Sequence, residues 1–256
     1  MNYRIRPLLL GEAEVPNVLD IFWSLSTDRG RSSVPILGFL LIAPDGEAVV
    51  VDCGMRDPQR AIDVHRLGPH SCSPEQALPA QLRLHGVQPE KVNTLILTHL
   101  HYDHCGNCAQ LPNARIIVQR TELMAAAAPM GPAAVPIGGK SLFYDRADVA
   151  ELVDSLWDRI ELIEGDFTPL PGIDCVLYDH THTPGHQCVY VRTEKGVAAI
   201  VGDIARKIDL NITQAIPPGI YYDLEKMRRA LADIGRRADL VLPTHDWDTL
   251  ERGRIG

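Results

Sequence analysis

The feature that most constrains this chain is an apolar run that leads directly into a cluster of histidines, VNTLILTHLHYDH at residues 92–104. Its first half has the composition of a buried β-strand. Side chains two residues apart on a strand point to the same face, so His99 and His101 are expected to project together. Asp103 and His104 would lie on the turn into the next helix, where they can point back toward the same place. The alternative, a polar turn with surface histidines, would crowd three imidazoles and a carboxylate together without any gain.

Three other expected strand ends also carry a histidine or an aspartate. They are His186 in a Thr-Pro-Gly-His-Gln loop, Asp203 after an apolar run, and His245 after the last apolar run. Each alone has an ordinary explanation as a loop or surface residue. Together with residues 99–104 they indicate one site built on the rigid ends of several strands, with side chains that bind metal ions.

The pattern of apolar runs and turn residues predicts mixed strands and helices in both halves of the chain. No linker, repeat or charged tail divides it, so we expect a single domain over residues 1–256, of the α+β class, with two β-sheets packed together and helices outside. The expected strands are 4–10, 36–43, 48–52, 92–97, 114–119, 160–163, 175–179, 187–192, 197–201 and 240–242, and the expected helices are 74–85, 120–128, 146–157 and 223–237.

Charge and composition exclude several classes of function. A net charge of −8 disfavours binding to nucleic acid or to anionic membranes. No apolar stretch approaches the roughly 20 residues that span a bilayer, and the N-terminal residues do not form a signal peptide, so a cytoplasmic location is expected. Six cysteines are then expected as thiols, with Cys105 and Cys108 as packing residues whose reactivity stays open.

With these motifs in place, the chain resembles the metallo-β-lactamase superfamily, an αββα sandwich with its metals at one edge. Within that superfamily it is most similar to the N-acyl-homoserine lactone lactonases. The local similarity lies in VVDCGM at 50–55, IIVQRTE at 116–122, IEGD at 163–166 and TPGHQ at 183–187, and it runs from about residue 36 to residue 245.

The resemblance implies a site with two divalent metal ions. Zn²⁺ is favoured, and Fe, Mn or Co would also suit imidazole and carboxylate ligands. A hydroxide held between the two metals would open a lactone, an activity that quenches quorum sensing, with Asp103 as the proton carrier and Asp52 holding a ligand histidine. The implied ligands are His99, His101 and His186 for one metal, Asp103, His104 and His245 for the other, and Asp203 as the bridge.

One position departs from the lactonase pattern. The lactonases resemble one another in a tyrosine three residues after the bridging aspartate, whereas this chain has Arg206 there. Arginine is a strong donor to an oxyanion or carboxylate, so we expect Arg206 to recognise or polarise the substrate acyl group of a lactone that is not a standard acyl-homoserine lactone. The alternative is a surface arginine that follows a strand.

Other functions of the same fold stay open. A thioesterase or cyclic-amide hydrolase would use the same metal centre, and a metal-holding sensor would bind the ions without turnover. The expected partner is a small lactone or ester, and a homodimer is left open. Two loops at 24–33 (with the nearby Phe22 and Trp23) and 124–139 are expected to shape the pocket or a subunit contact.

Overall fold

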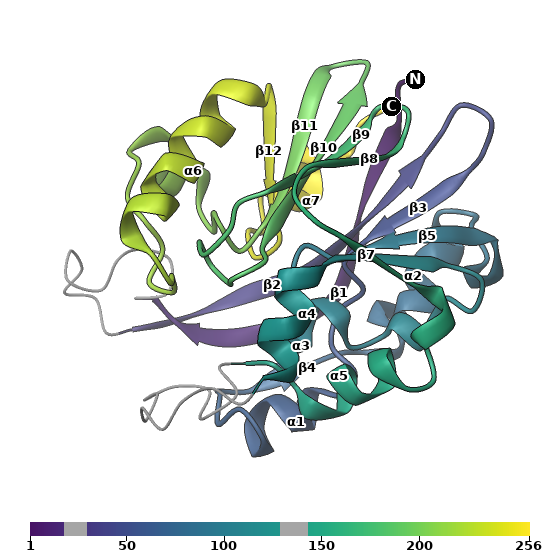
Figure 1. Cartoon of the computed structure of the whole chain (residues 1–256), viewed down its shortest axis with the longest axis horizontal. Helices are drawn as coiled ribbons and strands as arrows, with labels where there is room; N and C mark the ends of the chain where they lie inside the picture. The colour runs from purple at the N-terminus through teal and green to yellow at the C-terminus, as the bar shows by residue number, and fades with distance from the viewer. Residues whose placement is uncertain (18–29, 129–142) are drawn as a thin grey trace.

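The computed structural model describes residues 1–17, 30–128 and 143–256, which form two β-sheets packed face to face. The seven-stranded sheet has the order β4-β1-β2-β3-β5-β6-β7 and the five-stranded sheet the order β12-β11-β10-β9-β8. Figure 1 shows the two layers, with α6 outside one sheet and α1 to α5 outside the other. The expected αββα sandwich is therefore confirmed.

The seven-stranded sheet is antiparallel from β4 through β1 and β2 to β3, and parallel from β3 through β5 and β6 to β7. β1 pairs antiparallel with β2, and β2 with β3, while β3, β5, β6 and β7 run parallel. Its strands are β1 (Arg4–Pro16), β2 (Arg31–Ile42), β3 (Ala48–Val51), β4 (His70–Ser71), β5 (Val92–Ile96), β6 (Arg115–Gln119) and β7 (Ile160–Ile163). Its helices are α1 (Pro58–Asp63), α2 (Leu78–Leu84), α3 (Tyr102–Cys105), α4 (Arg120–Ala127) and α5 (Arg146–Val153).

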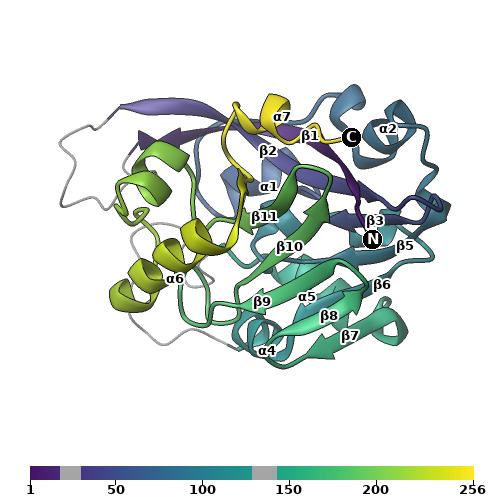
Figure 2. The same cartoon turned by 90° about the horizontal axis from the view of Figure 1, so that it is seen from above.

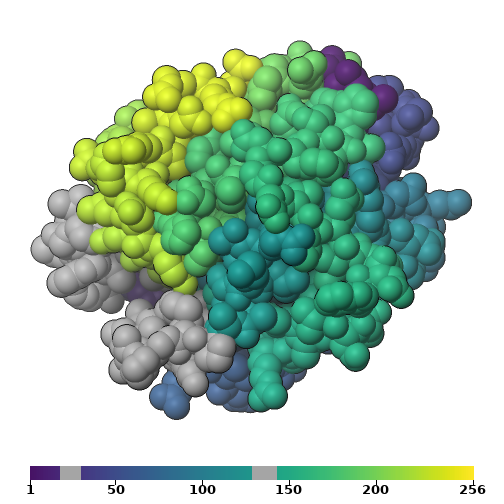
Figure 3. Space-filling view, viewed as in Figure 1, coloured from purple at the N-terminus to yellow at the C-terminus, as the bar shows by residue number. Residues whose placement is uncertain are grey.

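The five-stranded sheet is antiparallel except for the pair β11 and β12. Helix α6 covers its outer face, and α7 lies near β1 (Figure 2). In the space-filling view the green surface of this half lies between the yellow surface of α6 and the teal surface of the central segments (Figure 3). The elements are β8 (Phe167–Leu170), β9 (Ile173–Leu177), β10 (Gln187–Thr193), β11 (Gly196–Gly202), α6 (Leu224–Arg237), β12 (Leu240–Pro243) and α7 (Thr249–Arg252).

Alternation along the strands builds three apolar clusters. In β3, Val49 and Val51 face the interior between the sheets, while Val50 faces the cluster under α1 to α5. In β11, Ile200 faces the same interior and Val201 packs against α6. Because the central strands are covered on both faces, they read as continuous aliphatic runs in the sequence. These three clusters hold the strand ends rigidly enough to carry a site.

The structure corrects several expected boundaries. The helix expected at 74–85 is a 3-10 turn at Pro74–Gln76 followed by α2, because Pro79 cannot donate a backbone hydrogen bond inside a continuous helix. The helix expected at 146–157 ends at Val153. β1 continues beyond residue 10 to Pro16, through a register shift at Gly11.

The two loops expected to shape the pocket are only partly described. Residues 31–33 belong to β2 and residues 124–127 to α4, while Phe22, Trp23 and the segments 24–29 and 129–139 lie outside the described residues. In the described part of the chain, no helix has the length and apolar character needed to cross a membrane.

Candidate metal centre

The predicted histidines and aspartates gather at one edge of the sandwich, where strand ends of both sheets meet. His99, His101, Asp103 and His104 come from the segment after β5 in the seven-stranded sheet. Asp203 directly follows β11 and His245 follows β12 in the five-stranded sheet. All of them are buried or nearly so. The site therefore lies between the two layers and takes side chains from each.

The segment that carries the first histidines is held by buried carboxylates, because β5 ends at Ile96. The Thr98 N–H donates to Asp52 Oδ1 (2.8 Å), and the Leu100 N–H donates to Glu122 Oε1 (3.0 Å). His99 and His101 project together as the sequence predicts, although they lie beyond the last residue of β5. The carboxylates replace the missing strand partners and fix the loop.

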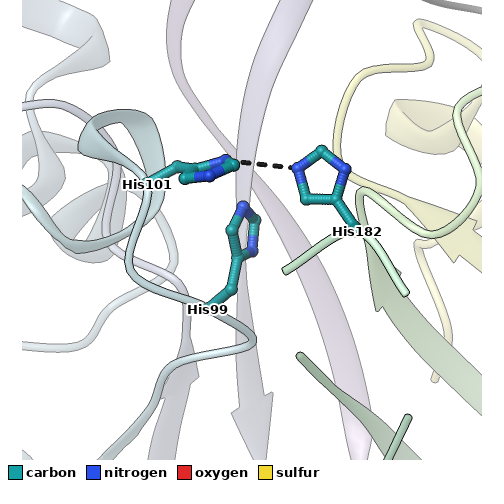
Figure 4. Close-up of side chains that lie close together, drawn as sticks. All are labelled: His99, His101 and His182. Atoms are coloured by element: carbon teal, nitrogen blue, oxygen red, sulfur yellow. Dashed lines mark hydrogen bonds between the residues drawn. The ribbon is translucent and has the colours of Figure 1, made fainter. Parts of the chain in front are cut away.

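Three imidazoles form the first group. The possible ligand atoms of His99, His101 and His182 all lie within 4.8 Å of one another. Figure 4 shows their rings converging, with His182 Nε2 at 3.2 Å from His101 Nδ1. His182 Nε2 is also 3.5 Å from Asp203 Oδ2. A cation placed among these atoms would meet several nitrogen lone pairs at once.

His182 and the predicted ligand His186 both lie beside this group, on the one loop between β9 and β10. Among the described residues, His186 belongs to none of the groups that could hold a metal. Its ring stacks on His99 with centroids 4.9 Å apart, and its Nε2 accepts the Asp203 N–H at 3.3 Å. Both histidines are buried, and their rings lie at similar centroid distances from His99 (5.0 Å for His182 and 4.9 Å for His186), so the ligand role of His186 stays a prediction.

A second group surrounds Asp203. Asp103, His104 and His245 bring their ligand atoms within 4.8 Å of one another. His245 Nε2 is 3.1 Å from Asp203 Oδ1 and His104 Nε2 is 3.4 Å from the same oxygen. Since Asp203 Oδ2 faces His182, its two oxygens face the two groups separately. This arrangement agrees with the bridging position expected of Asp203.

Hydrogen bonds at Nδ1 fix the tautomers of the histidines. His104 Nδ1 donates to Asp52 Oδ2 (2.8 Å), which confirms that Asp52 holds one of these histidines. His245 Nδ1 donates to the carbonyl of Pro35 (2.8 Å), and His182 Nδ1 donates to that of Ile220 (3.3 Å). A carbonyl only accepts, so in the neutral form of His245 and of His182 the proton lies on Nδ1 and Nε2 keeps its lone pair for a metal.

The first group is also kept neutral by its surroundings. Burial lowers the pKa of His99 and of His101 well below the ordinary value, and neighbouring imidazoles lower it further. Burial lowers the pKa of His182 to about 4. Neutral imidazole is the form that binds metal ions, so this group is ready for a cation at neutral pH.

In the second group, interactions between carboxylates and imidazoles outweigh burial in setting the pKa values of His104 and Asp203. Burial lowers the pKa of His104, but the carboxylates of Asp103, Asp52 and Asp203 raise it more, so it lies well above the ordinary value. Burial raises the pKa of Asp203, but His245 and His104 lower it more, so it lies well below the ordinary range. Asp203 is therefore a carboxylate anion among imidazoles, and its bridging role stays a prediction.

Orphaned nitrogen atoms test whether these residues fit a metal. In the described part of the chain, the buried Nε2 atoms of His99 and His104 and the buried Nδ1 atom of His186 have no hydrogen-bond partner. A buried polar atom without a partner is costly, and a bound cation would remove that cost. The donor set of nitrogen and carboxylate oxygen suits Zn²⁺ and similar ions. The residues present therefore fit two divalent cations.

Arg206 is buried beside this cluster, with only 5% of its surface exposed. Its Nη1 lies 3.4 Å from Asp203 Oδ2, and its backbone N–H donates to Asn211 Oδ1 (2.7 Å). The alternative of a surface arginine is therefore wrong. The guanidinium is held at the wall of the pocket next to the candidate bridging carboxylate.

A mostly apolar pocket opens onto the cluster. Tyr102 forms part of its wall, stacks on the buried ring of His65 (centroids 4.7 Å apart) and donates its hydroxyl to His70 Nε2 (2.7 Å). The sequence had not singled out either of these histidines. The apolar side chains of the pocket are Ala13, Val15, Val34, Leu67, Phe143 and Ile220.

The cysteines take no part in the cluster. All six are free, and Cys105 and Cys108 are buried, with Cys108 Sγ at 3.7 Å from Cys53 Sγ. Burial raises the pKa of the Cys105 thiol. These positions agree with the expected packing role.

The fold and the site together define a class of protein: an αββα sandwich that presents buried histidines and aspartates from the strand ends of both sheets. This is the architecture of a metal-dependent hydrolase fold. The family model of the metallo-beta-lactamase superfamily matches residues 39–245, and the chain belongs to that superfamily.

Relatives and solved structures agree with this placement. The chain is 28% identical over 233 residues to an N-acyl homoserine lactonase of Bacillus cereus, covering 86% of this chain and 81% of the relative. It is also 28% identical over 191 residues to one of Bacillus thuringiensis, covering 71% of this chain but only 66% of the relative. A crystal structure of an N-acyl homoserine lactone hydrolase with N-hexanoyl-L-homoserine at its catalytic metal centre superposes with a TM-score of 0.78 at 23% identity, covering 100% of this chain and 98% of the other. That likeness shows the fold.

Proposed function

We propose that this chain is a metal-dependent hydrolase that opens a lactone, either acyl-homoserine lactone-like or another cyclic ester. The observation that carries the proposal is the pair of buried His and Asp groups beside a mostly apolar pocket, with Nε2 lone pairs facing inward. The lactonase names of the relatives support the substrate class. A quorum-quenching role and a cytoplasmic location stay predictions that follow from this proposal.

Each group of side chains would hold one divalent ion, most simply Zn²⁺. His99, His101 and His182 would hold the first, and Asp103, His104 and His245 the second, with Asp203 between them. When bound, such a pair of ions makes a water acidic enough to lose its proton near neutral pH and polarises a carbonyl. His186, which the resemblance implies as a ligand of the first ion, is buried against His99 and stays a predicted ligand beside His182.

The remaining chemistry falls to the residues of this chain. Asp103 lies at the edge of the second group, with Oδ2 at 3.5 Å from His245 Nε2 and Oδ1 at 3.8 Å from His104 Nε2. Its carboxylate is placed to accept a proton from the nucleophile and to pass it to the leaving alkoxide oxygen, which balances the ring opening.

Arg206 would bind the acyl side of the substrate. Its guanidinium lies at the pocket wall beside Asp203 and presents donors that suit a carbonyl oxygen or a carboxylate. The apolar side chains around it exclude water and strengthen that hydrogen bond. A substrate with an acceptor group next to the scissile ester would suit this donor, and the change from the tyrosine of the lactonases to arginine is the reason to expect a substrate other than a standard acyl-homoserine lactone.

Metal content and a substrate panel test the proposal together. Protein purified without added metal should contain about two metal ions per chain and should release acid from some members of a lactone panel. Turnover of thioesters or cyclic amides alone would replace the lactonase by one of those hydrolases. Two bound ions without any turnover would favour a sensor, and full activity of a metal-free His99→Ala variant would refute the mechanism.

A further inference from the structure

A buried carboxylate outside both candidate ligand groups lies at the first turn of α4. Glu122 is fully buried and accepts four hydrogen bonds. Its Oε1 accepts from the Leu100 N–H (3.0 Å) and the Tyr144 hydroxyl (3.1 Å). Its Oε2 accepts from the Thr183 hydroxyl and the Gly185 N–H, both at 2.8 Å. None of these four donors carries a positive charge.

The partners of Glu122 belong to the two loops that carry the first group of histidines. Leu100 lies between His99 and His101, and Thr183 directly follows His182. One carboxylate therefore joins the loop after β5 to the loop between β9 and β10, through one oxygen for each loop. The distance between the two loops sets the distance between His182 and the other two imidazoles.

The packing around Glu122 leaves little freedom for this connection. A Cβ atom built on Gly185 would lie 2.3 Å from the backbone nitrogen of Glu122, so the two backbones are in close contact there. Burial raises the pKa of Glu122 above its ordinary value, and its four donors offset only part of that rise. Two of those donors are backbone N–H groups, which cannot accept, so they require an acceptor on Glu122.

We propose that Glu122 is a positioning residue for the first metal site, where it sets the separation of the two histidine loops and thereby the affinity for the ion. This inference rests on the proposed function, because it assumes that the histidine groups hold metal. Glu122 acts through backbone and hydroxyl groups and not through a ligand side chain. Polar groups that orient metal ligands typically contribute 10–100-fold to metal affinity.

The test is the affinity of the metal-stripped protein for Zn²⁺, measured by competition with a chromophoric chelator, together with the visible absorption of the Co²⁺ form. Glu122→Gln replaces one carboxylate oxygen by an amide nitrogen. Because that nitrogen is a donor, it would face a donor on one of the two loops and the hydrogen bond there would be lost. We expect Zn²⁺ binding at the first site to weaken about 10–100-fold and the Co²⁺ spectrum to change. Glu164→Gln is the matched control, because Glu164 is exposed and pairs with Arg120 of the same helix. It should behave as the unaltered protein.

Two milder variants keep the inference testable if Glu122→Gln does not fold. Thr183→Val removes a hydroxyl donor from the loop that carries His182, whereas Tyr144→Phe removes one from a residue outside both loops. Thr183→Val should therefore weaken Zn²⁺ binding more than Tyr144→Phe. Equal effects of the two variants would overturn a positioning role.

The outcomes separate this inference from the proposed function. If the unaltered protein takes up neither Zn²⁺ nor Co²⁺, the proposed function fails. If it binds both ions and folded Glu122→Gln matches it in affinity and spectrum, then Glu122 is a packing residue and only the inference fails. Weaker binding with a changed spectrum supports both.

Discussion

Replacing Asp52 with asparagine tests how the tautomer of His104 is set. Asp52 is fully buried and accepts from the Thr98 N–H, the Thr98 hydroxyl and His104 Nδ1, each at 2.8 Å. Its φ of 56° lies in the left-handed region, which asparagine tolerates as well as aspartate does. Asp52→Asn should therefore keep the backbone and change only the acceptor pattern.

The expected magnitude follows from those contacts. In the variant, the amide nitrogen of asparagine would face His104 Nδ1 as a donor. It would therefore favour the tautomer of His104 with its proton on Nε2. That proton occupies the position where a lone pair is needed to bind a metal. Loss of such an outer partner typically lowers metal affinity 10–100-fold, which is about 1.4–2.7 kcal/mol. The metal-free protein should also lose about 1.5–3 kcal/mol of unfolding free energy, because a hydrogen bond to a buried charge is removed.

Two assays measure these effects separately. Competition with a chromophoric chelator gives the Zn²⁺ affinity, and denaturant unfolding in the presence of a chelator gives the stability of the metal-free fold. The exposed Asp158 supplies the control Asp158→Asn, for which neither quantity should change. A folded Asp52→Asn protein whose Zn²⁺ affinity stays within twofold of the unaltered protein would refute the reasoning about the tautomer.

Three further predictions follow from the site. Arg206→Ala should lower kcat/KM on the best lactone about 100-fold. Arg206→Lys should restore little of this loss, since lysine lacks the planar guanidinium with its paired donors. Unchanged kcat and KM in Arg206→Ala would remove Arg206 from the site. Chelation should lower Tm by about 10–20 °C if both ions were present at about 100 times their dissociation constants, since each site then contributes about 2.7 kcal/mol, and an unchanged Tm would argue against bound metal in the starting protein. The metal-free protein should lose stability as the pH falls from about 6.5 to 4, because the unfolded chain protonates its histidines near pH 6.5 while burial lowers the pKa of His182 to about 4. The shift at His182 alone corresponds to about 3 kcal/mol of unfolding free energy. The raised pKa of His104 acts in the opposite direction. Denaturant unfolding at pH 7.5 and at pH 5 measures the net change in unfolding free energy.

The sequence predicted the central strands well because they are buried on both faces. The aliphatic runs at 36–43, 48–52 and 92–97 correspond to β2, β3 and β5, and their ends differ from those of the strands by at most five residues. Strand β8 escaped prediction because Pro169 interrupts its pattern, which an edge strand tolerates. Helix α1 was also missed, although Asp57 caps it and Pro58 opens it.

The types of the residues at the strand ends were enough to predict where the site lies. The residues at strand ends after β5, β11 and β12 gather as expected, because parallel packing of buried strands brings those ends to one edge. The position of His182 beside His186 depends on how one loop turns, and its spacing does not encode that turn. The roles of Glu122 and His70 depend on contacts between segments far apart in the chain, which no local pattern reveals.

The division of the histidine and aspartate side chains between the two sheets has a consequence for folding. The interior between the layers is apolar and places few directional constraints on their relative position. Ions held by His99 and His104 on one side and by His182, Asp203 and His245 on the other would act as a staple across the open edge of the sandwich. Amide hydrogen exchange at the ends of β11 and β12 should then slow on metal loading. The two layers would unfold together when loaded, and the edge that carries the site would open first when the ions are removed.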